Sequence, residues 1–237
     1  MNKICLPLDG LRTIEEVKNR IEELSEHVGM FKIGKELFTR FGPKVIGLVK
    51  ESGSEIFLDL KYHDIPNTVK GASYVATMLG VYMFNVHASG GLEMMKAAVS
   101  GAKEASEKYG LRMPKIIGVT VLTSIDQEIM NNEINIPGKI EDQVLSLATL
   151  TQKAGLDGVV CSAADLHVIK DKLPDDFMYV TPGIKLADSK KNDQKRVFTP
   201  GNAVKDGASV LVVGRAIPGF DPKEARVEAA KRVLEEI

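Results

Sequence analysis

The chain alternates short apolar runs with longer amphipathic stretches, and this alternation constrains its fold more than any other feature. The runs are short and rich in β-branched and other apolar residues, which is typical of parallel strands buried on both faces. They are Ile4–Leu8, Met30–Ile33, Ile56–Leu60, Met83–His87, Ile116–Leu122, Gly158–Cys161, Met178–Thr181 and Val210–Val213.

Stretches with helical periodicity separate these runs. The first, Thr13–Glu26, opens with a capping box between Thr13 and Glu16. The others are Gly34–Glu51, Pro66–Leu79, Leu92–Tyr109, Ile140–Ala154, Ala163–Leu173, a short helix at Asn202–Asp206, and Pro222–Ile237. Strands that each lead into a helix predict an α/β protein with one domain over residues 1–237, a (β/α)8 TIM barrel. An open doubly wound sheet is the alternative, but no G-x-G-x-x-G follows the first strand.

Charge and cysteine usage narrow the class of protein. Lysine and arginine total 31 against 32 aspartate and glutamate residues, a balance that argues against binding nucleic acid or a membrane surface. No apolar run approaches the ~20 residues that a membrane helix needs. Cys5 and Cys161 lie in apolar runs without metal-binding spacing, so we expect buried, reduced thiols. We expect a cytoplasmic enzyme or binding protein without a bound metal.

The stretch that carries chemistry follows the third apolar run. Strand alternation puts Asp59 and Lys61 on one side, and the end of a barrel strand is where active sites form. Burying both charges is costly unless they pair, so an ion pair without a function is the less favoured explanation. Asp64 follows at the turn into the next helix, where it is equally suited to be an N-cap.

The first two strands also end in charge. Asp9 closes L-P-L-D and Lys32 lies in M-F-K-I-G, and each alone is as well explained as a charge on the rim. Together with the third-strand charges they predict a network of alternating sign. Such a network keeps lysines protonated and separates the pKa values of acids, as catalytic sites require.

The last two strands predict a phosphate site. The seventh ends Thr181-Pro182-Gly183 and the eighth ends Val213-Gly214-Arg215, and barrel enzymes often bind phosphate there. Glycine allows close approach of the backbone, and Arg215 offers a bidentate grip. The alternative is that the glycines shape turns and Arg215 is solvated. The polar connection 183–199 carries several basic residues and is interpreted as a lid, with a surface loop as the alternative.

Two further polar residues follow strands. Thr123, expected at the end of the fifth strand, is suited to hydrogen-bond a heterocyclic amide or to cap the next turn. His87 ends the fourth strand and is interpreted as a structural histidine, because the four histidines are too scattered for a metal centre.

These motifs resemble the orotidine 5′-phosphate decarboxylase family over essentially the whole chain. The resemblance rests on L-P-L-D at 6–9, F-K-I-G at 31–34, L-D-L-K-Y-H-D-I-P-N-T at 58–68, V-T-V-L-T-S at 119–124, T-P-G-I at 181–184, D-Q-K-R at 193–196 and V-V-G-R at 212–215. It implies a homodimer that converts orotidine 5′-monophosphate to UMP and CO2, in pyrimidine nucleotide synthesis, without metal or organic cofactor.

The resemblance also implies roles for individual residues. Lys61 would protonate the pyrimidine carbon as the carboxylate leaves, and Asp59 would orient Lys61. The remaining assignments are Asp9 and Lys32 on the ribose, Thr123 on the pyrimidine, Pro182, Lys185, Gln194, Gly214 and Arg215 around the phosphate, and Asp64, Ile65 and Thr68 from the partner subunit. Bacterial members usually carry arginine where this chain has Lys185, so the phosphate contact there should be less directional.

Two rival functions share parts of this pattern. Sister barrels with the same D-x-K-x-x-D act on sugar phosphates and need Mg2+, for which their second strand supplies an acidic ligand. Here Lys32 occupies that place. A non-catalytic barrel that binds phosphonucleotides would keep Arg215 and the glycines but would not need Asp59, Lys61 and Asp64 together.

Overall fold

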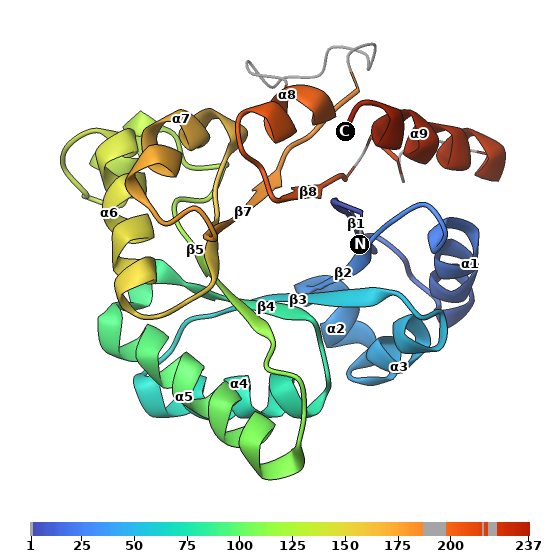
Figure 1. The fold of residues 1–237 in the computed structure, drawn as a ribbon, viewed down its shortest axis with the longest axis horizontal. Coiled ribbons are helices and arrows are strands. Elements are labelled where there is room, and N and C mark those ends of the chain that lie inside the picture. The colour runs from blue at the N-terminus through green and yellow to red at the C-terminus, as the bar shows by residue number, and fades with distance from the viewer. Residues whose placement is uncertain (1, 187–197, 215, 218–221) are drawn as a thin grey trace.

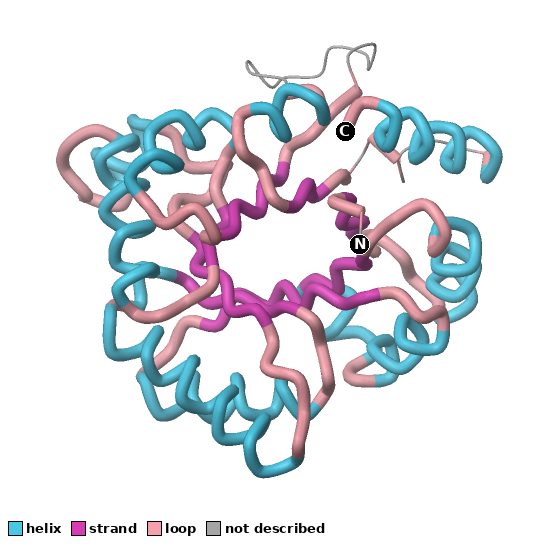
Figure 2. The backbone as a smooth tube through the Cα atoms, viewed as in Figure 1, coloured by secondary structure: helices cyan, strands magenta, loops and turns pink. Residues whose placement is uncertain are grey.

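The computed structural model describes residues 2–186, 198–214, 216–217 and 222–237. Eight parallel strands close into a barrel in chain order, from β1 next to β2 through to β8, which pairs back onto β1 (Figure 1). Helices form an outer ring around the strands (Figure 2). The predicted single (β/α)8 barrel is therefore confirmed, and the open-sheet alternative is excluded.

The strands are β1 Ile4–Pro7, β2 Met30–Gly34, β3 Glu55–Tyr62, β4 Met83–His87, β5 Lys115–Val119, β6 Gly158–Val160, β7 Met178–Pro182 and β8 Val210–Val212. The α-helices are α1 Ile14–Leu24, α2 Lys35–Phe41, α3 Lys44–Glu51, α4 Pro66–Met78, α5 Leu92–Tyr109, α6 Ile140–Lys153, α7 Leu166–Ile169, α8 Pro200–Lys205 and α9 Lys223–Glu235. Short 3₁₀ or π turns lie at Ala88–Gly90, Ile129–Glu133, Ala163–Asp165 and Lys170–Lys172.

Two buried layers hold the barrel together. Inside it, one side chain from most strands fills the axis, with Cys5, Met30, Phe57, Met83 and Ile117 among them. The larger layer lies between strands and helices. Because this inner apolar layer fills the barrel interior, polar side chains have room only near the carboxyl ends of the strands.

Three predicted elements differ from the structure by more than one or two residues at an end. The helix expected over Gly34–Glu51 is two helices, because Gly42 has a left-handed φ of 59° and Pro43 has no N–H with which to continue α2. The helix expected over Ala163–Leu173 is divided into a 3₁₀ turn, the short α7 and a second 3₁₀ turn. The fifth strand ends at Val119 rather than Leu122, because the chain turns at Leu122–Ile125.

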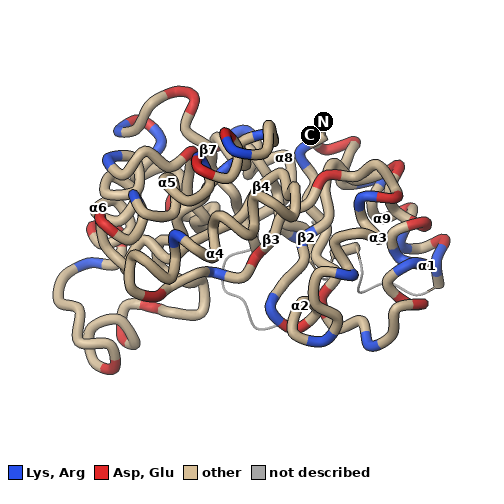
Figure 3. Tube along the Cα trace, turned by 90° about the horizontal axis from the view of Figure 1, so that it is seen from below, with Lys and Arg blue, Asp and Glu red and all other residues tan. Residues whose placement is uncertain are grey.

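The outer surface carries no segregated charge over the part of the chain that is described. Basic and acidic residues alternate over the outer helices (Figure 3). No helix among the described residues is both long enough and apolar enough to cross a membrane. The first-helix capping box is present, with Thr13 and Glu16 each accepting from the other's backbone N–H.

Candidate active site

Strand β3 is longer than its neighbours and irregular where its charges lie. It pairs with β4 at Leu58 opposite Phe84 and again at Tyr62 opposite Val86, so β3 takes four steps while β4 takes two. Within this bulge Lys61 has a left-handed φ of 52°, which is uncommon for a residue with a side chain. Simple alternation was therefore the wrong reason for placing Asp59 and Lys61 together, although the two side chains do meet.

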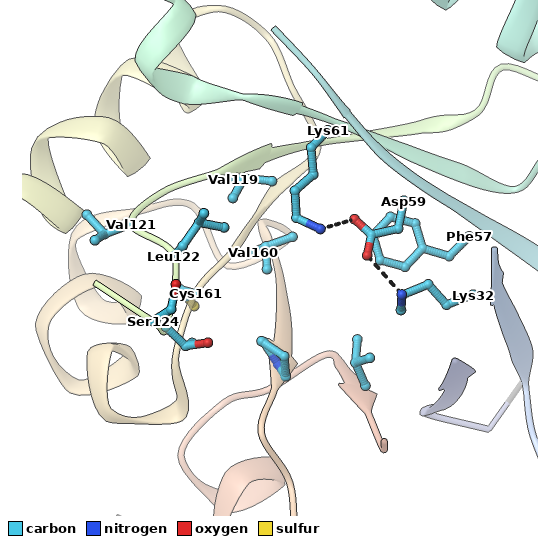
Figure 4. A pocket seen from close by; sticks show the side chains of 13 residues that line it. Lys32, Phe57, Asp59, Lys61, Val119, Val121, Leu122, Ser124, Val160 and Cys161 are labelled. Atoms are coloured by element: carbon cyan, nitrogen blue, oxygen red, sulfur yellow. Dashed lines mark hydrogen bonds and ion pairs between the residues drawn. The ribbon is translucent and has the colours of Figure 1, made fainter. Parts of the chain in front are cut away.

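Four charged side chains, Asp9 from the turn after β1, Lys32 from β2, and Asp59 and Lys61 from β3, form a chain of alternating sign. The Lys61 ammonium lies 2.6 Å from Asp59 Oδ1, and the Lys32 ammonium lies 3.1 Å from Asp59 Oδ2 (Figure 4). Lys32 also donates to both oxygens of Asp9, at 3.1 and 3.2 Å. The Asp59 side chain is 10% exposed, whereas the Asp9 side chain is 53% exposed, so the network runs from the barrel floor to its rim.

This network keeps its central members ionised. Burial destabilises the Lys32 ammonium, but the Asp59 and Asp9 carboxylates outweigh burial and raise the pKa of Lys32 above its ordinary value. Burial also opposes ionisation of Asp59, but Lys32 and Lys61 outweigh it and hold the Asp59 pKa below its ordinary value. Both groups are therefore charged at neutral pH.

Gly34 makes room for the outer ion pair of the network. It lies at the junction of β2 and α2, and a Cβ atom there would lie 2.7 Å from Asp9 Oδ1 and 3.1 Å from Lys32 Nζ. Any side chain at this position would crowd the pair. The glycine of F-K-I-G is thus explained by the charges that it accommodates.

A cavity of about 220 Å³ opens above Asp59 and Lys61. Its charged wall carries Lys32, Asp59 and Lys61, and Figure 4 shows the ammonium groups of the two lysines on either side of the Asp59 carboxylate. The remaining lining residues are Phe57, Val119, Val121, Leu122, Thr123, Ser124, Val160, Cys161, Pro182 and Val212. The cavity therefore combines one charged wall with apolar walls, which suits a planar ligand with an ionic group.

Asn85 belongs to this network although sequence reasoning missed it. Its side chain is fully buried; Nδ2 donates to Asp59 Oδ1 at 2.7 Å, and Oδ1 accepts from the Lys61 backbone N–H at 2.8 Å. The available signal was an asparagine inside the apolar run Met83–His87, since a buried amide needs partners.

Two histidines and two thiols complete the surroundings. The rings of His63 and His87 lie 5.4 Å apart. Burial, followed by the nearby His63, Lys35 and Lys61, lowers the pKa of His87 to about 4, so this ring is neutral at pH 7. Cys5 and Cys161 are buried and free, as predicted, and burial raises the pKa of both thiols.

Other predicted site residues lie away from the floor of the cavity. Thr123 does line it, but lies beyond the end of β5 rather than at it. Asp64, Ile65 and Thr68 are exposed at the start of α4 and do not line the cavity. Asp64 accepts from the Ile65 N–H at 2.7 Å, whereas the N-cap of α4 is Ile65, so the helix-cap alternative for Asp64 is wrong.

The predicted phosphate residues are only partly described. Pro182 lines the cavity, and Gly183 needs to be glycine because its φ is 82°. Lys185 is half-buried and donates its backbone N–H to Phe198 O, which joins the two ends of the 183–199 connection. Gln194 and Arg215, together with the basic residues Lys190, Lys191, Lys195 and Arg196, lie outside the described residues.

The described residues contain no group of three or more His, Cys, Asp or Glu side chains placed to hold a metal ion. The Lys32 ammonium lies between the Asp9 and Asp59 carboxylates and contacts both, each at 3.1 Å. A divalent cation between them would have to displace this positive charge.

Comparison with known proteins agrees with these features. Residues 2–230 match the sequence model described as the orotidine 5′-phosphate decarboxylase / HUMPS family. A Moorella thermoacetica protein named orotidine 5′-phosphate decarboxylase is 44% identical over 237 residues, covering 100% of this chain and 92% of that protein. A Geobacter sulfurreducens protein of the same name is 47% identical over 235 residues, covering 99% of this chain and 95% of that protein.

A solved structure gives the same result. The crystal structure of orotidine 5′-phosphate decarboxylase from Lactobacillus acidophilus aligns with a TM-score of 0.86 and 36% identity, covering 100% of this chain and 99% of the other. The chain belongs to the orotidine 5′-phosphate decarboxylase / HUMPS family.

Proposed function

We propose that this chain decarboxylates orotidine 5′-monophosphate to UMP and CO2, with Lys61 as the proton donor. The observation that carries the proposal is the Lys61 ammonium, held 2.6 Å from Asp59 Oδ1 at the floor of the cavity. The relatives from Moorella and Geobacter are named for this activity.

The chemistry needs such a group. When the bond between the ring carbon and the carboxylate breaks, CO2 leaves and the electron pair stays on a ring carbon without an adjacent electron sink. A fixed ammonium stabilises this charge and transfers its proton to the same carbon. Asp59 would lie against the substrate carboxylate, while Lys32 keeps the Asp59 pKa low enough for it to remain ionised.

Substrate binding is assigned to the rim. Asp9 and Lys32 would hold the ribose hydroxyls, and Thr123 would read the pyrimidine edge across the cavity from the charged wall. Phosphate would bind at Pro182, Lys185, Gln194, Gly214 and Arg215. Among the described residues a Cβ atom at Gly214 would meet only Pro7, at 4.0 Å, so packing does not require a glycine here, and the proposed reason is close approach of an anion to the backbone.

A homodimer would complete the site. Asp64, Ile65 and Thr68 are exposed and do not line the cavity of their own chain, and Ile65 is 67% exposed. Val75 and Met78, further along α4, are also exposed apolar residues. We propose that Asp64, Ile65 and Thr68 enter the partner's cavity, where Asp64 would face the partner's Lys61 ammonium.

The test follows the ultraviolet absorbance of orotidine 5′-monophosphate, which is lost as the substrate is consumed, in the presence of the wild type or of Lys61→Ala. We expect Lys61→Ala to lower kcat by at least about 10⁴-fold, because it removes both the proton and the fixed charge. The Kd for UMP should change far less, because UMP has no carboxylate to place against this wall.

Lys115→Ala is a matched control, because Lys115 is also ion-paired, 2.7 Å from Asp157, but at the opposite end of the barrel. It should retain wild-type kcat. A wild type that binds UMP but leaves the substrate intact would favour the phosphonucleotide-binding alternative. Activity lost with EDTA and restored by Mg2+ would favour the sugar-phosphate barrels.

A further inference from the structure

We infer that Asn85 is a positioning residue that holds the β3 bulge, and through it Lys61, in the geometry for proton transfer; this inference rests on the proposed function. It begins with the register of β3 and β4. The stretch from Leu58 to Tyr62 lies against Phe84 to Val86, so Asn85 is the one residue of β4 between the two paired positions. The bulge and the asparagine therefore face each other.

The amide of Asn85 joins both sides of the bulge. Its Oδ1 accepts a hydrogen bond from the Lys61 backbone N–H at 2.8 Å. This N–H is therefore satisfied by the Asn85 side chain. Its Nδ2 donates to Asp59 Oδ1 at 2.7 Å, the same oxygen that receives the Lys61 ammonium at 2.6 Å. One side chain thus fixes the backbone that carries the proton donor and the carboxylate that orients it.

The backbone of Lys61 needs such a constraint. A φ of 52° is unfavourable for a residue with a Cβ atom and persists only where the surroundings enforce it. Without the amide, the Lys61 N–H and Asp59 would lose a buried partner, and β3 would be free to relax toward ordinary pairing. Relaxation by one residue would turn the Lys61 side chain away from the cavity.

The orientation of the amide is dictated by its partners. Asp59, flanked by Lys32 and Lys61, is ionised and accepts only, whereas the Lys61 N–H donates only. Only an amide, or a protonated carboxyl group of the same shape, satisfies both. Aspartate at position 85 would set a second carboxylate against Asp59 and raise the pKa of the pair.

The experiment compares Asn85→Ala and Asn85→Asp with Val86→Ala as a matched control. Val86 is the next residue of β4, is fully buried and packs between the strands and helices, so its truncation weakens the same strand from the other side. For each protein, kcat, the Kd for UMP and the thermal midpoint are measured, and crystal structures are determined.

We expect Asn85→Ala to lower kcat by about 100-fold, because the proton donor is displaced, while the Kd for UMP changes by less than about threefold. Val86→Ala should lower the thermal midpoint but keep kcat within about twofold of the wild type. Asn85→Asp should be as slow as Asn85→Ala near pH 8 and should gain about tenfold relative to the wild type near pH 6, as the carboxyl group regains its proton.

Several outcomes would overturn the assignment. They are a kcat within about threefold of the wild type in Asn85→Ala, an equal loss of kcat in Val86→Ala, and no relative gain for Asn85→Asp at lower pH. The crystal structures decide independently of turnover, since an unchanged Lys61 φ and an unchanged contact with Asp59 in Asn85→Ala also contradict it. A wild type inert toward orotidine 5′-monophosphate, with a relaxed bulge in the variant, would instead refute the proposed function alone.

Discussion

The charged residues at the cavity floor differ in what holds them ionised. Lys32 lies between two carboxylates and Asp59 between two ammonium groups, so each is favoured by its neighbours more than it is disfavoured by burial. For His87 the balance is reversed, because burial and the neighbouring positive or titratable groups outweigh the one carboxylate that favours its charged form, Asp59. The His87 ring lies beside another imidazole and two lysines, and its neutral form is the stable one.

This difference predicts an acid-sensitive step in stability. The unfolded chain protonates His87 near pH 6.5, but the folded protein does so only near pH 4, so the unfolded state binds more protons between these values. The free energy of unfolding should therefore decrease as the pH is lowered from about 6.5 to about 4, by about 2 kcal/mol for a partly buried ring. His87→Gln should remove this slope, as measured by urea unfolding at a series of pH values.

The Asp59 contribution is separate in pH. Because the pKa of Asp59 is lowered on folding, its contribution to stability is present above the ordinary carboxylate pKa and is lost only as the pH falls below it.

For the His87 prediction, an unchanged dependence of the free energy of unfolding on pH between 6.5 and 4 in His87→Gln would show that another group is responsible.

At the scale of elements, the approach of α4 to α5 sets the position of the segment that carries Asp64. A Cβ atom at Gly101 of α5 would lie only 2.1 Å from Lys70 O of α4, so the glycine allows the two helices to pack closely. Ser73, three residues after Lys70 in α4, is fully buried. The backbone contact itself depends on the absence of a side chain at Gly101, and the ion pair between Lys70 of α4 and Glu104 of α5, at 2.9 Å, also joins the two helices.

Gly101→Ala should therefore push α4 away from α5 and lower the free energy of unfolding by about 1–3 kcal/mol. The matched control is Gly47→Ala in α3, where a Cβ atom would meet nothing within 4 Å. It should raise stability by about 0.5–1 kcal/mol, because alanine favours a helix. Equal effects of the two substitutions in urea unfolding would contradict this account.

At the scale of the whole molecule, the homodimer proposed above would share each site between two chains. If Asp64 serves the partner's cavity, Lys61→Ala and Asp64→Ala damage different parts of it. A mixed dimer of the two variants contains one doubly altered site and one intact site.

Each variant alone should be nearly inactive, and a mixture allowed to exchange subunits should recover about a quarter of wild-type activity, because half of the dimers are mixed and half of their sites are intact. Activity assays on the mixture before and after exchange measure this recovery. A mixture that stays inactive while mixed dimers are detected would place Asp64 in its own chain's site.

The barrel could be read from the chain because its signals are local. Apolar runs of strand length, helical periodicity and the Thr13 capping box depend on near neighbours, and the structure confirms them with small changes at the ends. Where the predicted helices were wrong, a left-handed glycine and a proline explain the break at Gly42-Pro43. The charges at 9, 32, 59 and 61 were also found, because charge is costly inside a barrel.

Only the tertiary structure decided how those charges meet. The bulge in β3, the left-handed Lys61 and the bridge made by Asn85 arise from pairing between strands that are far apart in the chain. The same holds for Gly34, whose missing side chain matters only because Asp9 and Lys32 come together beside it. The sequence by itself determined which residues carry charge and which strand each one follows or belongs to, since those depend on composition and period; Asp9 lies just after β1 and Lys32 inside β2, rather than at the strand ends. Cross-strand register decided their geometry, because it is set by contacts that no local pattern encodes.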